Sequence, residues 1–203
     1  DGEGFPDESK WGYEEGYIRN NEYQYYTVQR KENVYLKDGL LHLKCINADT
    51  LRNEQGEILN TKIAEGKTLI ITSASLLTKG KQDWQYGRFE VRAKTPMGRG
   101  VWPAIWMMPT DEYILQGWPN SGEIDIMEFV GNSPSYVHFT AHSQKYNEKN
   151  NNQRAMAALC PDSYINFHVY ALEWYRDRLD WYIDGELQFT YLNDNPIPGQ
   201  VSI

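Results

Sequence analysis

The chain has 203 residues, of which 40% are hydrophobic and 24% charged, and its formal net charge is −8 at pH 7. This length and balance predict a soluble, globular protein with a single domain over residues 1–203. The negative charge argues against nucleic acid as a partner, and because no stretch approaches 18 consecutive apolar residues, no membrane span is expected.

The first third of the chain is expected to form short strands. The stretch RNNEYQYYT at 19–27 places polar amides beside aromatic residues, and we interpret it either as a strand or as an Asn-rich turn. Residues 34–45 contain two alternating runs around Asp38-Gly39, which predicts a β-hairpin. The run LIITSASLLT at 69–78 predicts another strand.

The rest of the chain repeats this pattern. Residues 86–95 alternate between apolar and charged side chains. Residues 167–175 are apolar on both faces, as expected for a strand that is buried between two layers. Residues 178–191 contain a second hairpin signal, Asp184-Gly185, and 147–153 is a polar loop. Because no segment shows a long 3.6-residue period, we predict an all-β fold, a β-sandwich of two antiparallel sheets.

Residues 122–131, GEIDIMEFVG, place three carboxylates within six positions. The β-branched and aromatic residues between two glycines predict a strand, in which Glu123 and Asp125 share one face. Glu128 would fall on the opposite face, but a β-bulge near Ile126–Met127 adds one residue and returns it to the face of the other two. We therefore predict a bulged strand with all three acids on one face and Ile124 behind them in the core.

Three acids on one strand face repel one another, and such clustering is tolerated where a substrate, a metal or a base requires it. Close carboxylates shift one another's pKa values apart, so that one of them stays protonated near neutral pH. A retaining glycosidase needs such a pair, an ionised nucleophile and a protonated acid about 5–5.5 Å apart. The alternative is a solvated acidic strand edge, because so short a motif also occurs by chance.

Aromatic residues make up 14% of the chain, and three tryptophans lie close in sequence to the acids. Trp102 and Trp106 precede them in GVWPAIWMMP, and Trp118 leads into them. Each either lines a groove, where sugar rings stack on flat aromatic faces, or packs in the core. After the acids, residues 136–147 alternate, and their position favours a groove-facing His142 over a purely structural histidine.

The two cysteines, Cys45 and Cys160, either form one disulfide or remain buried thiols. The sequence has no Cys/His spacing of the kind that binds zinc, and we expect no metal site. It begins at Asp1 without Met or a signal peptide, which indicates a processed or excised chain and agrees with a secreted origin.

Several of these stretches, taken in order, resemble glycoside hydrolase family 16. The acid segment EIDIME, preceded by WPAIWMMP and followed by AHSQKYN, is similar to the laminarinase-type endo-β-1,3-glucanases of that family. RNNEYQYYT, YGRFEVRAKTP, FHVYALEW and WYIDGE occur in the family's usual order, so the resemblance covers nearly the whole chain. The inserted Met127 corresponds to the bulged form of the signature, which the lichenase branch lacks.

The resemblance implies a β-jelly-roll with a concave substrate groove and a retaining endo-hydrolase that needs no cofactor. By position, Glu123 resembles the nucleophile, Glu128 the general acid/base, and Asp125 the residue that hydrogen-bonds the nucleophile. The residues that resemble substrate-binding positions are Asn21, Trp102, Trp106, Trp118 and His142. The expected partner is a β-glucan polysaccharide or oligosaccharide, bound by a secreted, periplasmic or cell-surface monomer.

Relative to the family pattern, the chain is expected to lack terminal strands, because it begins at DGEGFPDESKW and ends at PGQVSI. The calcium site that many members build from those regions is therefore not expected. Mixed-linkage β-1,3-1,4-glucan, a galactan or transglycosylation remain alternatives within the family. Two other classes remain: a non-catalytic carbohydrate-binding domain, against which the intact acids argue, and a domain that binds calcium through the acids, for which one strand face supplies too few oxygens.

Overall fold

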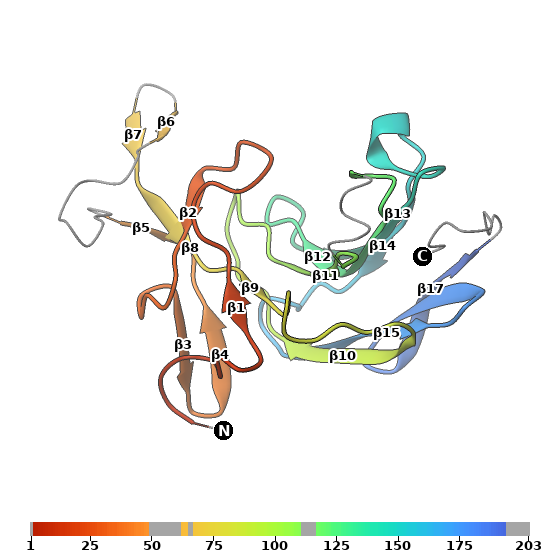
Figure 1. The fold of residues 1–203 in the computed structure, drawn as a ribbon, viewed down its shortest axis with the longest axis horizontal. Helices are drawn as coiled ribbons and strands as arrows, with labels where there is room; N and C mark the ends of the chain where they lie inside the picture. Colours follow the sequence, from red (N-terminus) through yellow and green to blue (C-terminus); the bar gives the residue numbers. More distant parts are fainter. Residues whose placement is uncertain (1, 49–61, 65–66, 111–116, 194–203) are drawn as a thin grey trace. The chain divides into compact units, whose positions relative to one another are not determined.

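A computed structural model describes residues 2–48, 62–64, 67–110 and 117–193 (Figure 1). The chain forms two compact units, residues 1–83 and 84–203. Among the described residues, no helix is both long and apolar enough to cross a membrane. That the two units make up one domain stays a prediction.

The first unit consists of short strands. They are β1 (Gly12–Tyr13), β2 (Gln24–Tyr26), β3 (Val34–Lys37), β4 (Leu40–Leu43), β5 (Ile46–Asn47), β6 (Lys62–Ala64), β7 (Lys67–Leu69), β8 (Ile71–Ser73) and β9 (Leu76–Leu77). The hairpin predicted over 34–45 is confirmed, because β3 pairs with β4 and both turn residues, Asp38 and Gly39, have positive φ angles. The stretch 19–27 contains both predicted features, a left-handed turn at Asn20-Asn21 and the strand β2.

The prediction of one strand over 69–78 is wrong, because this stretch is divided among three strands. β7 pairs with β6, β8 lies between β2 and β5, and β9 pairs with β1. Each piece has a different partner, so the chain leaves the strand conformation at residue 70 and again at 74–75. Hydrophobic pattern alone does not show these changes of partner.

The second unit contains two four-stranded antiparallel sheets (Figure 1). One has the order β10 (Gly87–Ala93), β15 (His168–Trp174), β16 (Arg178–Ile183), β17 (Glu186–Leu192). The other has the order β11 (Ala104–Met107), β12 (Glu123–Phe129), β13 (Tyr136–His142), β14 (Arg154–Leu159). The 3-10 turn η1 (Glu148–Asn150) lies between β13 and β14, within the predicted polar loop. The predicted all-β fold with two antiparallel sheets is confirmed.

The two sheets of this unit enclose its hydrophobic core. Phe129 and Phe139 come from one sheet, Leu172 and Trp181 from the other, and all four side chains are fully buried. The Trp181 ring stacks on Phe139 at 6.4 Å between ring centroids. Because these inward side chains alternate with outward ones, the opposite face of the β11–β14 sheet presents its own set of residues away from the core.

The strands predicted for the second unit are confirmed. Along β10, half-buried apolar residues alternate with exposed charged ones. The centre of β15 is buried at three consecutive residues, as expected for a strand covered on both faces. The β16–β17 hairpin turns at Asp184 and Gly185, which both have positive φ angles.

Candidate active site

The candidate site is built on β12, which has an irregular register with β13. Asp125 lies opposite Thr140 and Glu128 opposite His138. On β12, Ile126 and Met127 therefore separate Asp125 from Glu128, while on β13 Phe139 alone separates their partners. This two-against-one pairing is a β-bulge, and it confirms the bulge predicted near Ile126–Met127.

The bulge brings the three acids to one face of the strand. Glu123 lies opposite His142, and Asp125 lies opposite Trp106 on the other neighbouring strand. Residues directly opposite one another in an antiparallel pair share a face, so these side chains belong to one surface. The residues between the acids point into the core: Ile124, Ile126 and Met127 are 4%, 4% and 2% exposed.

Asp125 is the most buried of the three acids, with an exposure of 3%. Burial first, and then the charges of Glu123 and Glu128, raise the pKa of Asp125 to about 10. Asp125 therefore holds its proton at neutral pH and donates it in a hydrogen bond to the Glu123 side chain.

Glu128 also favours its protonated form. Burial raises the pKa of Glu128, and the charges of Glu123 and Glu148 act in the same direction. The indole N–H of Trp102, which donates to Glu128 Oε1 at 2.9 Å, lowers that pKa and only partly offsets the rise. A half-buried acid with a raised pKa and a fixed donor beside it has the properties of a general acid.

Glu123 is held by a different tryptophan. Trp118 Nε1 donates to Glu123 Oε2 at 2.6 Å, and the Trp118 ring lies 5.4 Å from the ring of His142. Lys149 in turn donates to the Trp118 main-chain oxygen at 3.2 Å. With the bond from Asp125, Glu123 accepts two hydrogen bonds, which fix the orientation of its side chain.

The structure shows which of the three tryptophans near the acids pack in the core and which are exposed. Trp102 is 66% exposed, although its N–H reaches Glu128, so it is not a core residue. Trp106 and Trp118 are half-buried and lie beside Asp125 and Glu123. All three therefore border the acids, although their contact with a sugar stays a prediction.

His142 lies on the acid face, as expected from its position in β13. It is 8% exposed, and its Nε2 is 3.6 Å from Asp125 Oδ2. Burial lowers the pKa of His142 despite the opposing charges of Glu123 and Glu148, so the ring is neutral at neutral pH. Asn21 belongs to the first unit, where it is exposed, and its place near the cleaved sugar stays a prediction.

Sequence reasoning missed the contribution of Glu148 and Lys149. Both lie on η1, within a stretch interpreted only as a polar loop. Glu148 acts on Glu128 and His142 through its charge, and Lys149 contacts Trp118. No motif marks these residues, because their effect depends on where the β13–β14 connection folds back.

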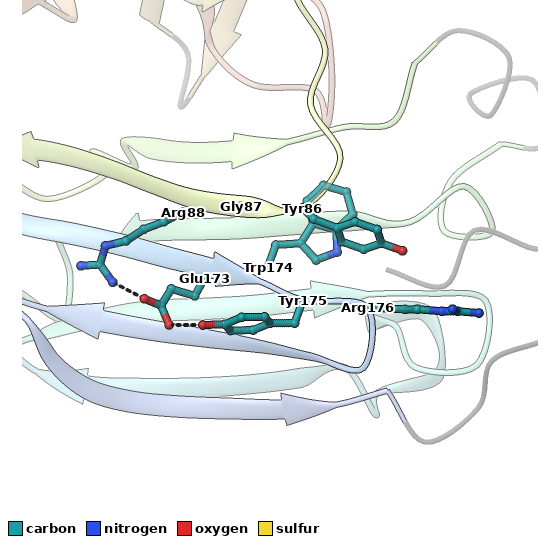
Figure 2. A pocket seen from close by; sticks show the side chains of 7 residues that line it. All are labelled: Tyr86, Gly87, Arg88, Glu173, Trp174, Tyr175 and Arg176. Carbon is teal, nitrogen blue, oxygen red and sulfur yellow. Dashed lines mark hydrogen bonds and ion pairs between the residues drawn. The ribbon is translucent and has the colours of Figure 1, made fainter.

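A separate hollow of about 400 Å³ lies on the other sheet (Figure 2). It is lined by Tyr86, Gly87, Arg88, Glu173, Trp174, Tyr175 and Arg176. Glu173 already accepts hydrogen bonds from Arg88 and from the hydroxyl groups of Tyr175 and Tyr182, all at 2.8–2.9 Å. The charge of Glu173 is thus satisfied within the protein.

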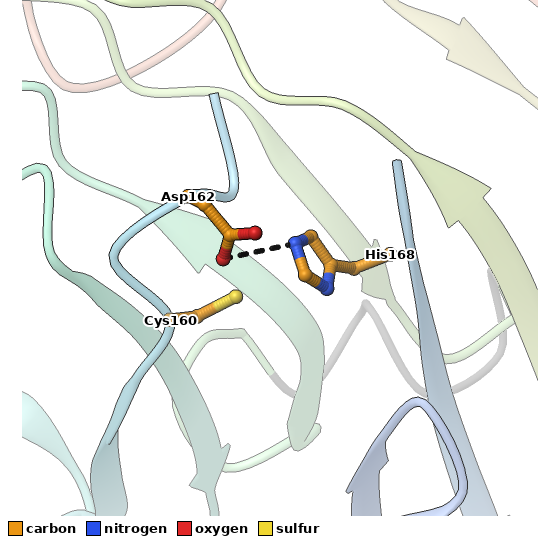
Figure 3. Close-up of side chains that lie close together, drawn as sticks. All are labelled: Cys160, Asp162 and His168. Atoms are coloured by element: carbon orange, nitrogen blue, oxygen red, sulfur yellow. Dashed lines mark ion pairs between the residues drawn. The ribbon is translucent and has the colours of Figure 1, made fainter. Parts of the chain in front are cut away.

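The cysteines are both thiols: Cys45 is exposed and Cys160 buried. The disulfide alternative is therefore wrong, and the expectation of buried thiols is correct for Cys160 and wrong for Cys45. Cys160 lies close to Asp162 and His168, a combination of metal-ligating side chains that the sequence analysis passed over (Figure 3).

The chain is similar to known proteins along most of its length. The model of the family "Glycosyl hydrolases family 16" matches residues 21–201. A beta-glucanase of Rhodothermus marinus is 42% identical over 194 residues, covering 94% of this chain and 62% of that protein. Glucan endo-1,3-beta-glucosidase A1 of Niallia circulans is 35% identical over 201 residues, covering 92% of this chain and 28% of that protein.

The fold is similar as well. The X-ray structure of the laminarinase from Rhodothermus marinus superimposes with a TM-score of 0.82 at 40% identity, over 96% of this chain and 72% of that one. The chain thus spans less than two thirds of the length of the two sequence relatives. Since the family model covers most of the chain and the acid segment has the bulged geometry predicted for it, the chain belongs to glycoside hydrolase family 16.

Proposed function

We propose that the protein hydrolyses internal β-1,3 bonds of laminarin-type glucan and retains the anomeric configuration. The observation that supports this most is the difference in environment among three acids on one strand face. Asp125 and Glu128 have raised pKa values, whereas Glu123 accepts hydrogen bonds from Trp118 and Asp125. The names of the relatives, a beta-glucanase and a glucan endo-1,3-beta-glucosidase, agree with this substrate.

The mechanism follows from these environments. The Glu123 carboxylate attacks the anomeric carbon while Glu128 protonates the oxygen of the leaving sugar, so that the glycosidic bond breaks and a glycosyl-enzyme ester forms. Glu128, now ionised, takes a proton from water, and that water attacks the same carbon and releases Glu123. Asp125 keeps its proton throughout and holds Glu123 in position.

Substrate binding is assigned to the aromatic residues around the acids. Trp102 is exposed beside Glu128 and offers a flat apolar face to a glucosyl ring. Trp106, Trp118 and His142 border the same face, and Asn21 is a further contact carried over from the family resemblance. We further propose a jelly-roll groove for the glucan, a monomer that acts without a cofactor, and a secreted, periplasmic or cell-surface location.

Reducing-end release tests this proposal. The protein and its Glu123→Gln variant are compared on laminarin, mixed-linkage β-1,3-1,4-glucan and agarose. Activity on laminarin should fall at least about a thousandfold in the variant, while laminarin binding persists. NMR of the first products should show the β-anomer. Binding without hydrolysis by the folded protein would indicate a carbohydrate-binding function instead, and unchanged activity of the variant would exclude Glu123 as nucleophile.

A further inference from the structure

Cys160, Asp162 and His168 form a cluster of potential metal ligands away from the acids on β12. One ligand atom from each, a thiol sulfur, a carboxylate oxygen and an imidazole nitrogen, lies within 4.8 Å of the others. Figure 3 shows the three side chains converging on one space between the end of β14 and the start of β15. Their sequence spacing, C-x-D-x5-H, matches no common zinc motif, which is why the sequence did not reveal them.

His168 is oriented by a fourth residue, Asp184. Asp184 Oδ2 lies 2.7 Å from His168 Nδ1, and Asp184 Oδ1 accepts the Val169 main-chain N–H at 2.8 Å. A carboxylate only accepts hydrogen bonds, so His168 Nδ1 must donate its proton to Asp184. In the neutral ring, which is the form that binds a metal, the lone pair of the other nitrogen, Nε2, then faces Cys160 and Asp162. A carboxylate behind a histidine is the usual support of a metal-binding imidazole.

His168 Nε2 has no hydrogen-bond partner among the described residues, although it is buried. Asp162 Oδ1 lies 3.2 Å from it, at ion-pair distance but without the geometry of a hydrogen bond. A tetrahedral zinc ion bound at about 2.0–2.1 Å to both atoms would separate them by about 3.3 Å. The observed spacing therefore suits an ion between these two atoms.

The types of ligand indicate which ion would bind. A thiol and an imidazole are poor ligands for Ca²⁺ or Mg²⁺, which prefer oxygen, whereas Zn²⁺ accepts sulfur, nitrogen and oxygen together. The Cys160 thiolate and the Asp162 carboxylate would balance the charge of a divalent cation. Cys160 is 4% exposed and fixed in the core, whereas Asp162 is 42% exposed, so the ion would enter from the Asp162 side.

We propose that Cys160, Asp162 and His168 bind one Zn²⁺ ion, with Asp184 as the positioning residue of His168 and water in the fourth position. The ion links the end of β14, the following turn and the first residue of β15, so its role is to fix this connection. None of its ligands lies on the face of the acids, and the proposal does not depend on the proposed glucanase activity.

The test uses protein treated with a chelator and then dialysed. Zn²⁺ is titrated by calorimetry, and Co²⁺ is used as a spectroscopic probe, because a thiolate ligand gives Co²⁺ an intense near-ultraviolet charge-transfer band. One Zn²⁺ per chain should bind and raise Tm, whereas Mg²⁺ should not. Absence of the Co²⁺–thiolate band would overturn the proposal and indicate a simple ion pair among His168, Asp162 and Asp184.

Matched variants identify the ligands. Cys160→Ser should abolish the thiolate band and weaken Zn²⁺ binding at least about 100-fold, whereas Cys45→Ser should leave both unchanged. Because Cys160 is a core residue, Asp162→Asn provides a second variant at a partly exposed position. Asp184→Asn should weaken binding about 10- to 100-fold and keep the thiolate band, as expected for a positioning residue. Binding that is lost in Cys45→Ser, or kept in both Cys160→Ser and Asp162→Asn, would contradict the assignment.

Discussion

Trp181 on β16 donates its indole N–H to the main-chain carbonyl of Asp125 on β12 at 2.9 Å, inside the core. The bond joins the two sheets of the second unit directly beneath the acids. Because Trp181 is fully buried and stacked between Phe139 and Phe189, its N–H is fixed in direction. The main chain at the start of the bulge is thus anchored to the opposite sheet.

Trp181→Phe should therefore destabilise the protein and disturb the acids above it. The variant leaves the buried Asp125 carbonyl without its donor, which costs about 1–3 kcal/mol in the free energy of unfolding, in addition to any loss of packing. Denaturant unfolding measures the change. Trp174→Phe is the control, because Trp174 Nε1 has no hydrogen-bond partner among the described residues. Equal destabilisation by both variants would show that the bond to Asp125 is unimportant.

The raised pKa of Asp125 predicts how stability varies with pH. Between its unfolded pKa of about 3.9 and its folded pKa of about 10, the folded chain binds a proton that the unfolded chain releases. This group therefore lowers stability as pH rises through that window, by at most about 1.4 kcal/mol per pH unit. Asp125→Asn lacks this dependence, so its stability relative to the unmodified protein should increase from pH 5 to 8.

Unfolding curves at several pH values test this, with Asp177→Asn as the control because Asp177 is an exposed aspartate. That variant should follow the pH dependence of the unmodified protein. If Asp125→Asn also follows it, Asp125 is not protonated in the folded state.

Trp102→Phe should shift the pH profile of hydrolysis to higher pH. The Trp102 N–H lowers the pKa of Glu128, so its removal raises that pKa and keeps the acid protonated further into the basic range. The basic limb of the plot of kcat/KM against pH should move to higher pH. The aromatic face is retained, so KM should change less than in Trp102→Ala. A shift to lower pH would contradict the role of this bond.

Glu148→Gln should have the opposite effect. The negative charge of Glu148 raises the pKa of Glu128, and its removal should move the basic limb of kcat/KM to lower pH. Glu148 is exposed, so salt should screen it. The profile of the unmodified protein should approach that of the variant at high ionic strength. Profiles that stay apart in high salt would indicate a structural cause.

Gly131 is expected to tolerate no side chain. A Cβ at this position would lie 1.9 Å from the Gly98 carbonyl oxygen and 2.6 Å from Val101 Cγ2. Because the nearer atom is main chain, Gly131→Ala should destabilise the protein by about 3 kcal/mol, at the upper end of overpacking effects. Thermal unfolding measures the loss. Adding Val101→Ala should not restore stability, and full restoration would place the clash at Val101 instead.

The acid face was predictable because it depends on local geometry. The spacing of Glu123, Asp125 and Glu128 requires a bulge if the acids are to meet, and the register of β12 with β13 contains it. The two Asp-Gly hairpins were predictable for a similar reason, since their turns need residues that accept positive φ angles.

Features that depend on long-range packing were not predictable. The stretch 69–78 has a continuous strand pattern, but its pieces pair with different partners. Glu148 influences Glu128 only because η1 returns toward β12. Cys160, Asp162 and His168 meet because a turn brings the end of one strand beside the start of another. The periodicity of the sequence does not show which segments, distant along the chain, lie close together in the fold.

The bulge in β12 also determines which changes to this strand the protein can accept. The alignment of Glu128 with Glu123 depends on how many residues separate them, not on which apolar residues these are. Exchanging Ile126 or Met127 for another apolar residue of similar volume keeps that count and changes only packing. Deleting either one would remove the extra residue that the bulge accommodates, and in the regular strand that results the last acid would lie four positions after Glu123, on the same face. The extra residue and the bulge should therefore be present together or absent together in natural variants of this strand, since either state keeps the three acids on one face.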